Sequence, residues 1–211
     1  MPPRPFPYPC SVGVDICSIQ RVKSLVQRRP RHAQPESTSL PQLHPFLARV
    51  FSFHEILLFN LRFKTLLHEP ATGHDPALVT SAVRYLAGRF AAKEAVIKAV
   101  QSRRILLKDV LVATDGGQPY AIVLDRSPVM THVQRLYLNQ TYGFSIPIST
   151  ETDQHVASSP SPDLEGHPDV ASGLEQCEGQ VAKLSISHDG DYATAVCLAA
   201  VQSDSTSRTL L

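Results

Sequence analysis

The stretch RYLAGRFAAKEAVIKAV at residues 84–100 constrains the fold most strongly, because its apolar residues recur with the period of a helix. At 3.6 residues per turn, Phe90 and Ile97 lie nearly in line, and Glu94 falls about 40° from that line, at the edge of the apolar face. Lys98 lies one turn beyond Glu94, so the two can pair or share a ligand. An exposed pair of this kind is common and contributes only about 0.3–0.5 kcal/mol. The helix alone therefore does not distinguish a surface pair from a functional site.

The length, charge and cysteines of the chain narrow its class. With 211 residues, it is long enough for one domain with a substantial core and too short to favour two large domains. The formal net charge is only +1, so we expect no nucleic-acid partner. The spacing of the four cysteines predicts reduced thiols instead of disulfides or a structural zinc: Cys10, Cys17, Cys177 and Cys197.

Membrane and targeting signals are weak. The longest apolar run, AVCLAAV at residues 195–201, is far shorter than the roughly 20 residues of a membrane span, so we expect no membrane partner. The segment MPPRPFPYPC lacks the apolar core of a secretory signal and the amphipathic arginine pattern of a transit peptide. These features predict an intracellular protein, either cytoplasmic or mitochondrial.

Periodicity predicts a chain that mixes helices with antiparallel strand pairs. DGGQP and Asp189–Gly190 are typical hairpin turns. The predicted elements are, in order, a strand over 11–19 that continues into a helix over 20–29, a helix over 46–67, the long helix over about 78–101, a hairpin over 107–124, a helix over 128–138 and two strands over 181–201.

Two internal segments are rich in Pro, Ser and other polar residues. We expect flexible insertions at 29–45 and 144–180 within a single domain that spans 10–202, followed by a disordered tail at 203–211. The most polar part, at about 149–179, cannot bury enough apolar surface to offset its ordering entropy.

Three short motifs carry side chains that are useful in chemistry. GVDI places Asp15 near the end of a buried strand, where it can also simply cap the helix that follows. The long helix carries Glu94 and Lys98. In SISH at 185–188, serines alternate with apolar residues along a strand, and His188 reaches the turn. A turn histidine on its own is usually a solvated side chain.

In this order, the motifs resemble those of the 4′-phosphopantetheinyl transferases, and specifically the short holo-acyl-carrier-protein synthase type. That family has G-x-D-I with an arginine six residues after the aspartate, then A-x-R-F-A-A-K-E-A-x-x-K-A, a G-x-P hairpin and S-x-S-H before an Ala-rich strand. This chain has GVDI with Arg21, AGRFAAKEAVIKA, GGQP, and SISH followed by YATAV.

The resemblance implies a fold and an activity. The fold is α+β, with a small, mainly antiparallel sheet packed against a long central helix, the 4′-phosphopantetheinyl transferase fold. The activity is transfer of 4′-phosphopantetheine from coenzyme A to a serine of acyl carrier protein, with release of adenosine 3′,5′-bisphosphate. The resemblance also implies Mg²⁺, because charge develops on phosphate oxygens and Mg²⁺ accepts carboxylates, phosphates and water as ligands.

It further implies roles at the reaction centre. Asp15 and Glu94 are the expected metal ligands and, with Lys98, the expected catalytic residues. Lys98 faces the phosphates and stabilises the leaving group. The serine proton goes either to Glu94 or to a water held by Glu94 and the metal, and both alternatives stay open.

Other residues are expected to bind the two substrates. Lys98 and His188 are expected to contact the coenzyme, and Arg89 and Lys93 to meet its 3′-phosphate, with a structural role as the alternative for Lys93. Arg21 is expected to dock the acidic helix of the carrier, and its alternative is a hydrated helix surface.

Two residues or segments have no assigned role. Glu55 matches a recurrent acid of the family whose role is open. After the long helix, the Gly-Thr-Gly loop of the family is replaced by QSRRILL, where Arg103 and Arg104 can supply charge in place of backbone amides.

The resemblance also implies a homotrimer with the coenzyme at the subunit interface. The alternative function is a catalytically idle relative that binds carrier protein or coenzyme A as an assembly factor. Such a relative would be free to lose Asp15, Glu94 or Lys98, and all three are present, which favours catalysis.

Overall fold

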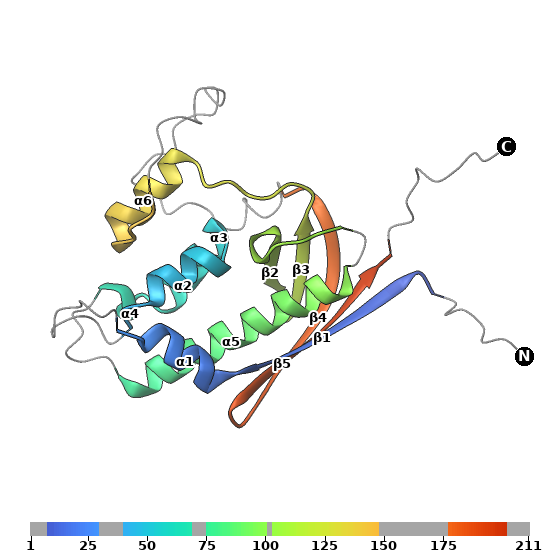
Figure 1. The fold of residues 1–211 in the computed structure, drawn as a ribbon, viewed down its shortest axis with the longest axis horizontal. Helices are drawn as coiled ribbons and strands as arrows, with labels where there is room; N and C mark the ends of the chain where they lie inside the picture. The colour runs from blue at the N-terminus through green and yellow to red at the C-terminus, as the bar shows by residue number, and fades with distance from the viewer. Residues whose placement is uncertain (1–7, 30–39, 69–74, 101–102, 148–176, 202–211) are drawn as a thin grey trace, which may run out of the picture.

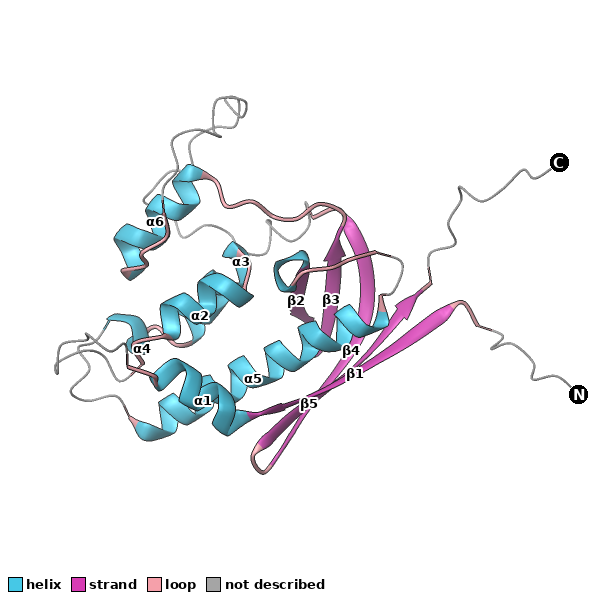
Figure 2. Ribbon diagram, in the orientation of Figure 1, coloured by secondary structure: helices cyan, strands magenta, loops and turns pink. Residues whose placement is uncertain are grey.

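The computed structural model describes residues 8–29, 40–68, 75–100, 103–147 and 177–201 of the chain. In these ranges, one antiparallel sheet is covered on one face by helices, and the long helix α5 lies directly against it (Figure 1; Figure 2). The predicted α+β architecture, with a small antiparallel sheet against a long central helix, is confirmed.

The sheet has the strand order β1-β5-β4-β3-β2, and every neighbouring pair is antiparallel. Both predicted hairpins are present. Gly116 and Gly117 form the β2–β3 turn and Gly190 lies in the β4–β5 turn, all at positive φ, which favours glycine. The strands are β1 (Cys10–Ser18), β2 (Val110–Asp115), β3 (Gln118–Leu124), β4 (Gly179–Asp189) and β5 (Tyr192–Ala200).

The helices connect these strands on one side of the sheet (Figure 2). Among the described residues, no helix combines the length and the apolar character that a membrane span requires. The helices are α1 (Ile19–Gln27), α2 (Leu43–Val50), α3 (Phe53–Arg62), α4 (Thr65–His68), α5 (Pro76–Ala99), the 3-10 helix η2 (Leu107–Asp109) and α6 (His132–Tyr142).

Helix α5 begins at a clear signal and runs along the sheet. The side chain of Asp75 caps the helix by accepting a hydrogen bond from the Ala77 N–H, and Pro76 occupies the first turn. The helix is rich in alanine where it meets the sheet, so the two backbones approach closely. A Cβ atom built at Gly13 of β1 would lie 1.9 Å from the carbonyl oxygen of Ala95. The glycine of the GVDI motif therefore sets the distance between β1 and α5.

Alternation along the strands gives the sheet two different faces. The face toward α5 belongs to the main hydrophobic core and is lined on β5 by small buried residues such as Ala193, Ala195 and Cys197. The outer face carries large apolar side chains that are 42% to 65% exposed: Val12, Val14, Ile16, Val196 and Leu198.

The helix predicted over 46–67 is instead three helices, α2, α3 and α4. The first break falls at Ser52, which forms a capping box with Glu55: the Ser52 hydroxyl accepts from the Glu55 N–H, and the Glu55 carboxylate accepts from the Ser52 N–H. Apolar side chains continue across this break, since Phe51 and Phe53 both pack in the core. Apolar spacing alone therefore did not reveal it.

The predicted insertions are shorter than expected where the structure describes their ends. Leu43 lies inside the predicted insertion at 29–45, yet it is buried and begins α2. Phe144 lies inside the predicted insertion at 144–180 and is also buried. Both boundaries therefore move inward, because isolated large apolar residues in a polar stretch still pack in the core. Of the expected mobile part at about 149–179, residues 149–176 lie outside the described residues, as does the tail at 203–211, whereas Gly179 begins β4.

Candidate functional site

Asp15 lies on the face of β1 that is turned toward α5. Gly13 is two residues earlier on the same face, so the strand brings Asp15 to the point where β1 crosses the helix. Asp15 does not cap the following helix. The N-cap of α1 is Ser18, whose side chain accepts a hydrogen bond from the Arg21 N–H. The carboxylate of Asp15 is thus available to a site between β1 and α5.

Lys98 of α5 contacts Asp15 directly. Its Nζ donates to Asp15 Oδ1 at 2.7 Å and to the Val14 carbonyl at 3.1 Å. The Lys98 side chain is 52% exposed, against 16% for that of Asp15. The hydrogen bond to Asp15 raises the pKa of Lys98 above its usual range, so the lysine stays a cation. The partner of Lys98 is thus the strand aspartate and not the helix neighbour Glu94.

Glu94 and Arg21 belong to the same neighbourhood. Cys17 is the next inward-facing residue of β1 after Asp15, and it is buried. Burial raises the pKa of the Cys17 thiol, Arg21 opposes this shift, and the carboxylates of Asp15 and Glu94 add to it. Three charged groups are therefore close enough to act on one thiol. Asp15, Glu94 and Lys98 therefore lie near one another where β1 crosses α5.

The donor set at this crossing fits a magnesium ion that binds together with a substrate. Within the described part of the chain, no group of three or more His, Cys, Asp or Glu side chains could hold a metal ion. The crossing offers two carboxylates, Asp15 and Glu94. Mg²⁺ often takes one or two carboxylates and completes its shell with phosphate oxygens and water. Two protein ligands are thus enough when a phosphate ligand is also present.

Three arginines line a cavity of about 430 Å³ between the middle of α5 and the turn ends of β2, β3 and β4. None of the described residues that line it carries a carboxylate. Guanidinium groups pair with phosphate oxygens in a planar, two-point geometry, so this cavity suits a phosphorylated ligand. We call it the arginine pocket, and its basic residues are Arg62, Arg84 and Arg89, with His188 beside them.

His188 reaches the arginine pocket because α5 has a glycine opposite it. The His188 Nε2 lies 2.9 Å from the carbonyl oxygen of Arg84, so this nitrogen donates its hydrogen to the helix backbone. A Cβ atom built at Gly88 would lie 2.8 Å from the same nitrogen. His188 is therefore held against α5 and is not a freely solvated turn residue.

Arg89 enters the pocket in a defined orientation. Its Nη1 donates to the Val112 carbonyl at 2.6 Å, and its Nη2 donates to Thr114 Oγ1 at 3.3 Å. The guanidinium carbon lies 5.0 Å from the centre of the Tyr85 ring, within the range of a cation–π contact. The edge strand β2 and the Tyr85 ring thus set the orientation of Arg89, which is predicted to bind the coenzyme.

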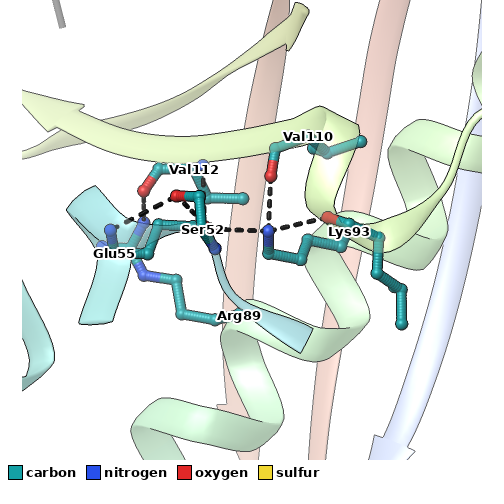
Figure 3. Close-up of polar contacts among 7 residues, drawn as sticks. Ser52, Glu55, Arg89, Lys93, Val110 and Val112 are labelled. Atoms are coloured by element: carbon teal, nitrogen blue, oxygen red, sulfur yellow. Dashed lines mark hydrogen bonds and ion pairs between the residues drawn. The ribbon is translucent and has the colours of Figure 1, made fainter. Parts of the chain in front are cut away.

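Lys93 does not line the arginine pocket, which corrects its predicted contact with the coenzyme. Its fully buried Nζ donates to Glu55 Oε2 at 2.7 Å, to the Leu107 carbonyl at 2.9 Å and to the Val110 carbonyl (Figure 3). Burial lowers the pKa of Lys93, and the adjacent Glu55 opposes this shift. All three ammonium hydrogens have partners, so no donor remains for a phosphate. The structural alternative therefore holds for Lys93.

Arg21 is exposed on α1 beside a second cavity of about 270 Å³, which lies among α1, α2 and α5. Arg49 of α2 also lines this cavity, and most of the other lining residues are apolar, among them Leu25, Phe46 and Phe90. We call it the α1–α2 groove. Two cations around an apolar floor suit an acidic, amphipathic partner.

Sequence analysis did not single out Arg49, Arg62 or Arg84. The first two lie on α2 and α3, outside every motif, and only the fold brings them to the two cavities. The position of Arg84 could have been inferred from the sequence. It lies one turn before Gly88 on the long helix, so the two share a helix face that a small residue opens to a neighbour.

The segment that follows α5 also differs from its prediction. Arg103 was a candidate to supply charge to the phosphates, but it donates to the Leu124 carbonyl and lies 3.8 Å from the carboxylate of Asp125. Arg103 therefore ties the segment to the end of β3 and is not directed at the site. Arg104 is exposed.

Comparison with known proteins gives a family. Residues 11–158 match the model of the 4′-phosphopantetheinyl transferase superfamily. The chain is 30% identical over 205 residues to 4′-phosphopantetheinyl transferase B, mitochondrial, of Aspergillus fumigatus, an alignment that covers 93% of this chain and 97% of the relative. It is 32% identical over 110 residues to a holo-[acyl-carrier-protein] synthase of Myxococcus xanthus, covering 52% of this chain and 64% of the relative.

Solved structures give a further comparison. A holo-ACP-synthase from Plasmodium yoelii aligns over 92% of this chain and 95% of its own, with 15% identity and a TM-score of 0.46. The family assignment rests on the sequence matches, together with the ordered motifs and the gathering of Asp15, Glu94 and Lys98. The chain therefore belongs to the 4′-phosphopantetheinyl transferase superfamily and is a transferase.

Proposed function

We propose that the chain is a holo-[acyl-carrier-protein] synthase, which transfers 4′-phosphopantetheine from coenzyme A to a serine of acyl carrier protein in a Mg²⁺-dependent reaction. One observation carries the proposal: a lysine and two carboxylates meet at the crossing of β1 and α5, on the same helix that lines a carboxylate-free arginine pocket. A phosphate-transfer enzyme needs both parts, one for the reacting phosphate and one for the rest of the anionic substrate. Two relatives are named holo-[acyl-carrier-protein] synthase, which supports acyl carrier protein as the acceptor.

In this proposal, coenzyme A lies along α5. Its 3′-phosphate and nearby phosphates pair with Arg89 and with the other cations of the arginine pocket, and His188 closes the pocket from β4. Its pyrophosphate extends along the helix toward Glu94 and Lys98. Lys98 has three hydrogens on a flexible stem and is half exposed, so it can reach a phosphate without breaking the fold.

Asp15 and Glu94 are the residues that would hold Mg²⁺. When bound, the ion would neutralise charge that develops on the pyrophosphate oxygens. Because the protein offers two carboxylates, the remaining ligand positions are left to phosphate oxygens and water.

The protein groups then divide the chemistry. The carrier serine oxygen forms a bond to the phosphorus next to pantetheine, and the bond from that phosphorus to the bridging oxygen breaks. Adenosine 3′,5′-bisphosphate leaves with that oxygen, and Lys98 stabilises its negative charge. The serine proton passes to Glu94, directly or through one water that Glu94 holds.

The α1–α2 groove is the proposed docking site for the carrier. Arg21 and Arg49 would meet acidic side chains, while Leu25, Phe46 and Phe90 would contact an apolar side chain of the carrier. Phe90 lies one turn before Glu94 on α5, which would bring a docked serine toward the reaction centre.

A homotrimer remains part of the proposal. The outer sheet face exposes Val12, Val14 and Ile16 on β1 beside Val196 and Leu198 on β5. A contiguous apolar patch of this kind is typical of an interface, and a second copy of this chain would cover it. As for the compartment, resemblance to a relative named as mitochondrial favours the mitochondrial alternative.

The test is direct. Apo acyl carrier protein is incubated with the chain, coenzyme A and Mg²⁺, and the carrier is weighed by mass spectrometry. We expect the carrier to gain the mass of one phosphopantetheine group and to lose this gain when Mg²⁺ is chelated. Binding of coenzyme A without any mass gain would contradict the proposal and would favour the idle relative.

A further inference from the structure

Glu55 has no part in the proposed reaction, yet it is among the most completely bonded side chains in the described structure. It is 5% exposed and lies on the first turn of α3. Its Oε2 accepts from the Ser52 N–H at 3.0 Å, the Ser52 hydroxyl at 3.1 Å and the Lys93 ammonium at 2.7 Å. Its Oε1 accepts from the Val112 N–H at 3.1 Å (Figure 3). All four partners are donors, as an ionised carboxylate requires.

These contacts converge on the free edge of the sheet. Among the described strands, β2 lies at an edge of the sheet and pairs only with β3. On its other edge, the Val112 N–H meets Glu55, the Val112 carbonyl meets Arg89, and the Val110 carbonyl meets Lys93. In an antiparallel strand, alternate residues direct both backbone groups to the same side. Three charged side chains therefore occupy positions that a further strand would otherwise take.

The same edge holds Arg89 in the arginine pocket. Arg89 lies one turn before Lys93 on α5, and its guanidinium is oriented by the Val112 carbonyl and by Thr114. The place of Val112 relative to α5 depends in turn on Glu55 and Lys93, which tie α3, α5 and β2 together (Figure 3). A shift of β2 along α5 would move the acceptor that sets the direction of Arg89.

We propose that Glu55 is a positioning residue for coenzyme binding, which acts through Lys93 and the edge of β2 to orient Arg89. The inference rests on the proposed function, because it takes coenzyme A as the ligand of the arginine pocket. Glu55 would not touch the coenzyme. It would set the geometry in which Arg89 meets a phosphate.

The substitution Glu55→Gln separates a positioning role from a direct charge effect on the coenzyme and from a role in stability alone. A glutamine amide must direct N–H toward a group that is itself a donor, either Val112 N–H on one side or Ser52 N–H and Lys93 on the other. It also leaves the Lys93 cation buried without its counter-charge. Positioning therefore predicts weaker binding of coenzyme A, by about tenfold or more, whereas loss of a negative charge near a polyanion site predicts tighter binding. A role in stability alone predicts an unchanged dissociation constant for the folded protein.

The experiment is isothermal titration of coenzyme A into the wild-type chain and into Glu55→Gln, with the folded fraction checked by circular dichroism. Leu138→Ala is the matched control, because Leu138 is fully buried on α6 and does not line the arginine pocket. It should lower the melting temperature and leave the dissociation constant unchanged. Equal or tighter binding by Glu55→Gln would overturn the inference.

Ser52→Ala covers the case in which Glu55→Gln fails to fold. It removes both hydrogen bonds of the Ser52 hydroxyl, the one donated to the Glu55 carboxylate and the one accepted from the Glu55 N–H, without changing any charge, so we expect coenzyme binding to weaken by at least about twofold. Unchanged binding by this variant would count against the inference. Failure of the wild-type chain to bind coenzyme A would instead overturn the proposed function.

Discussion

The ammonium of Lys98 lies 2.7 Å from the carboxylate of Asp15, although the two residues are 83 positions apart in the chain. The contact joins the first strand to the last turn of the central helix. It brings together a flexible cation and a carboxylate on a rigid strand, with Glu94 one turn earlier on the same helix. Such a pair is partly exposed and contributes little to stability. The position of these residues therefore matters more for chemistry than for folding.

The first prediction follows from this contact. Asp15→Ala and Glu94→Ala should each abolish transfer to the carrier and leave the melting temperature within a few degrees of the wild-type value, because both carboxylates serve the reaction more than the core. The measurement is carrier modification by mass spectrometry at saturating Mg²⁺, with thermal unfolding in parallel. Near-normal turnover by either variant would show that its carboxylate is not a metal ligand.

The second prediction concerns the strand–helix crossing. Gly13→Ala places a methyl group 1.9 Å from the Ala95 carbonyl oxygen, and backbone atoms cannot move aside as a side chain can. We expect the free energy of unfolding to fall by about 1–3 kcal/mol or more. Chemical denaturation measures this change. Gln20→Ala, an exposed substitution on α1, should change it by less than about 0.5 kcal/mol. A loss no larger for Gly13→Ala than for this control would contradict the close approach.

The reaction centre could be predicted from the sequence because its residues lie on regular elements. Strand alternation places Asp15 on the same face as Gly13, and helix periodicity places Glu94 and Lys98 one turn apart. Order along the chain then links the motifs to a family. Local periodicity does not report which charged side chain is buried. Lys93 and Glu94 are neighbours, yet Lys93 is buried because Glu55, 38 positions away, supplies its counter-charge.

The rest of the site depends on packing between distant elements. Arg62 reaches the arginine pocket only because α3 packs beside α5, where its guanidinium lies 5.3 Å from the Tyr85 ring. Arg49 reaches the α1–α2 groove in the same way. Neither position follows from a local pattern. The helix break at Ser52 also could not be predicted from apolar spacing, because the capping box begins a new helix while the apolar pattern continues.

The third prediction is a pH dependence of stability. Burial lowers the pKa of His44 below its ordinary value of 6.5, and its ring stacks on Phe144 with centroids 4.4 Å apart. The unfolded chain therefore binds a proton more readily than the folded chain. The stability that neutral His44 contributes is present above about pH 6.5 and is lost as the pH falls below it.

Thermal unfolding at about pH 7.5 and about pH 5.5 tests this dependence. The wild-type melting temperature should fall on acidification. His44→Phe keeps an aromatic ring against Phe144 but does not titrate, so its melting temperature should fall less. His54, whose pKa is also lowered by burial, should account for part of the remaining fall. An equal fall in the wild type and in His44→Phe would contradict the prediction.

The fourth prediction tests the proposed trimer. Val14 lies in the middle of the exposed apolar face and is 53% exposed. Val14→Asp places a charge at the proposed interface, so we expect a smaller assembly in sedimentation velocity than for the wild-type chain. Gln140→Asp, an exposed change on α6, should sediment like the wild type. A wild-type monomer would remove the outer sheet face from consideration as an interface between copies.

The last prediction concerns carrier docking. Arg21 flanks the α1–α2 groove together with Arg49, and it also acts on the Cys17 thiol beside the reaction centre. A carrier with an acidic helix would thus be held next to Asp15 and Glu94. Arg21→Glu should raise the KM for the carrier by at least about tenfold, roughly 1.4 kcal/mol, and should leave the KM for coenzyme A nearly unchanged, because coenzyme A is proposed to bind in the other cavity.

Salt and a matched variant separate docking from general electrostatics. The carrier KM of the wild-type chain should rise with ionic strength as the Debye length falls below about 8–10 Å, and this rise should be weaker in Arg21→Glu. Arg28→Glu makes the same charge change at the exposed C-terminal end of α1, outside the residues that line the groove, and should have a much smaller effect. Equal rises in KM for both substrates would indicate a disturbed reaction centre. No rise in the carrier KM would exclude α1 from the docking surface. If the exposed face of α1 is only hydrated, reversal of one charge there should leave the carrier KM unchanged.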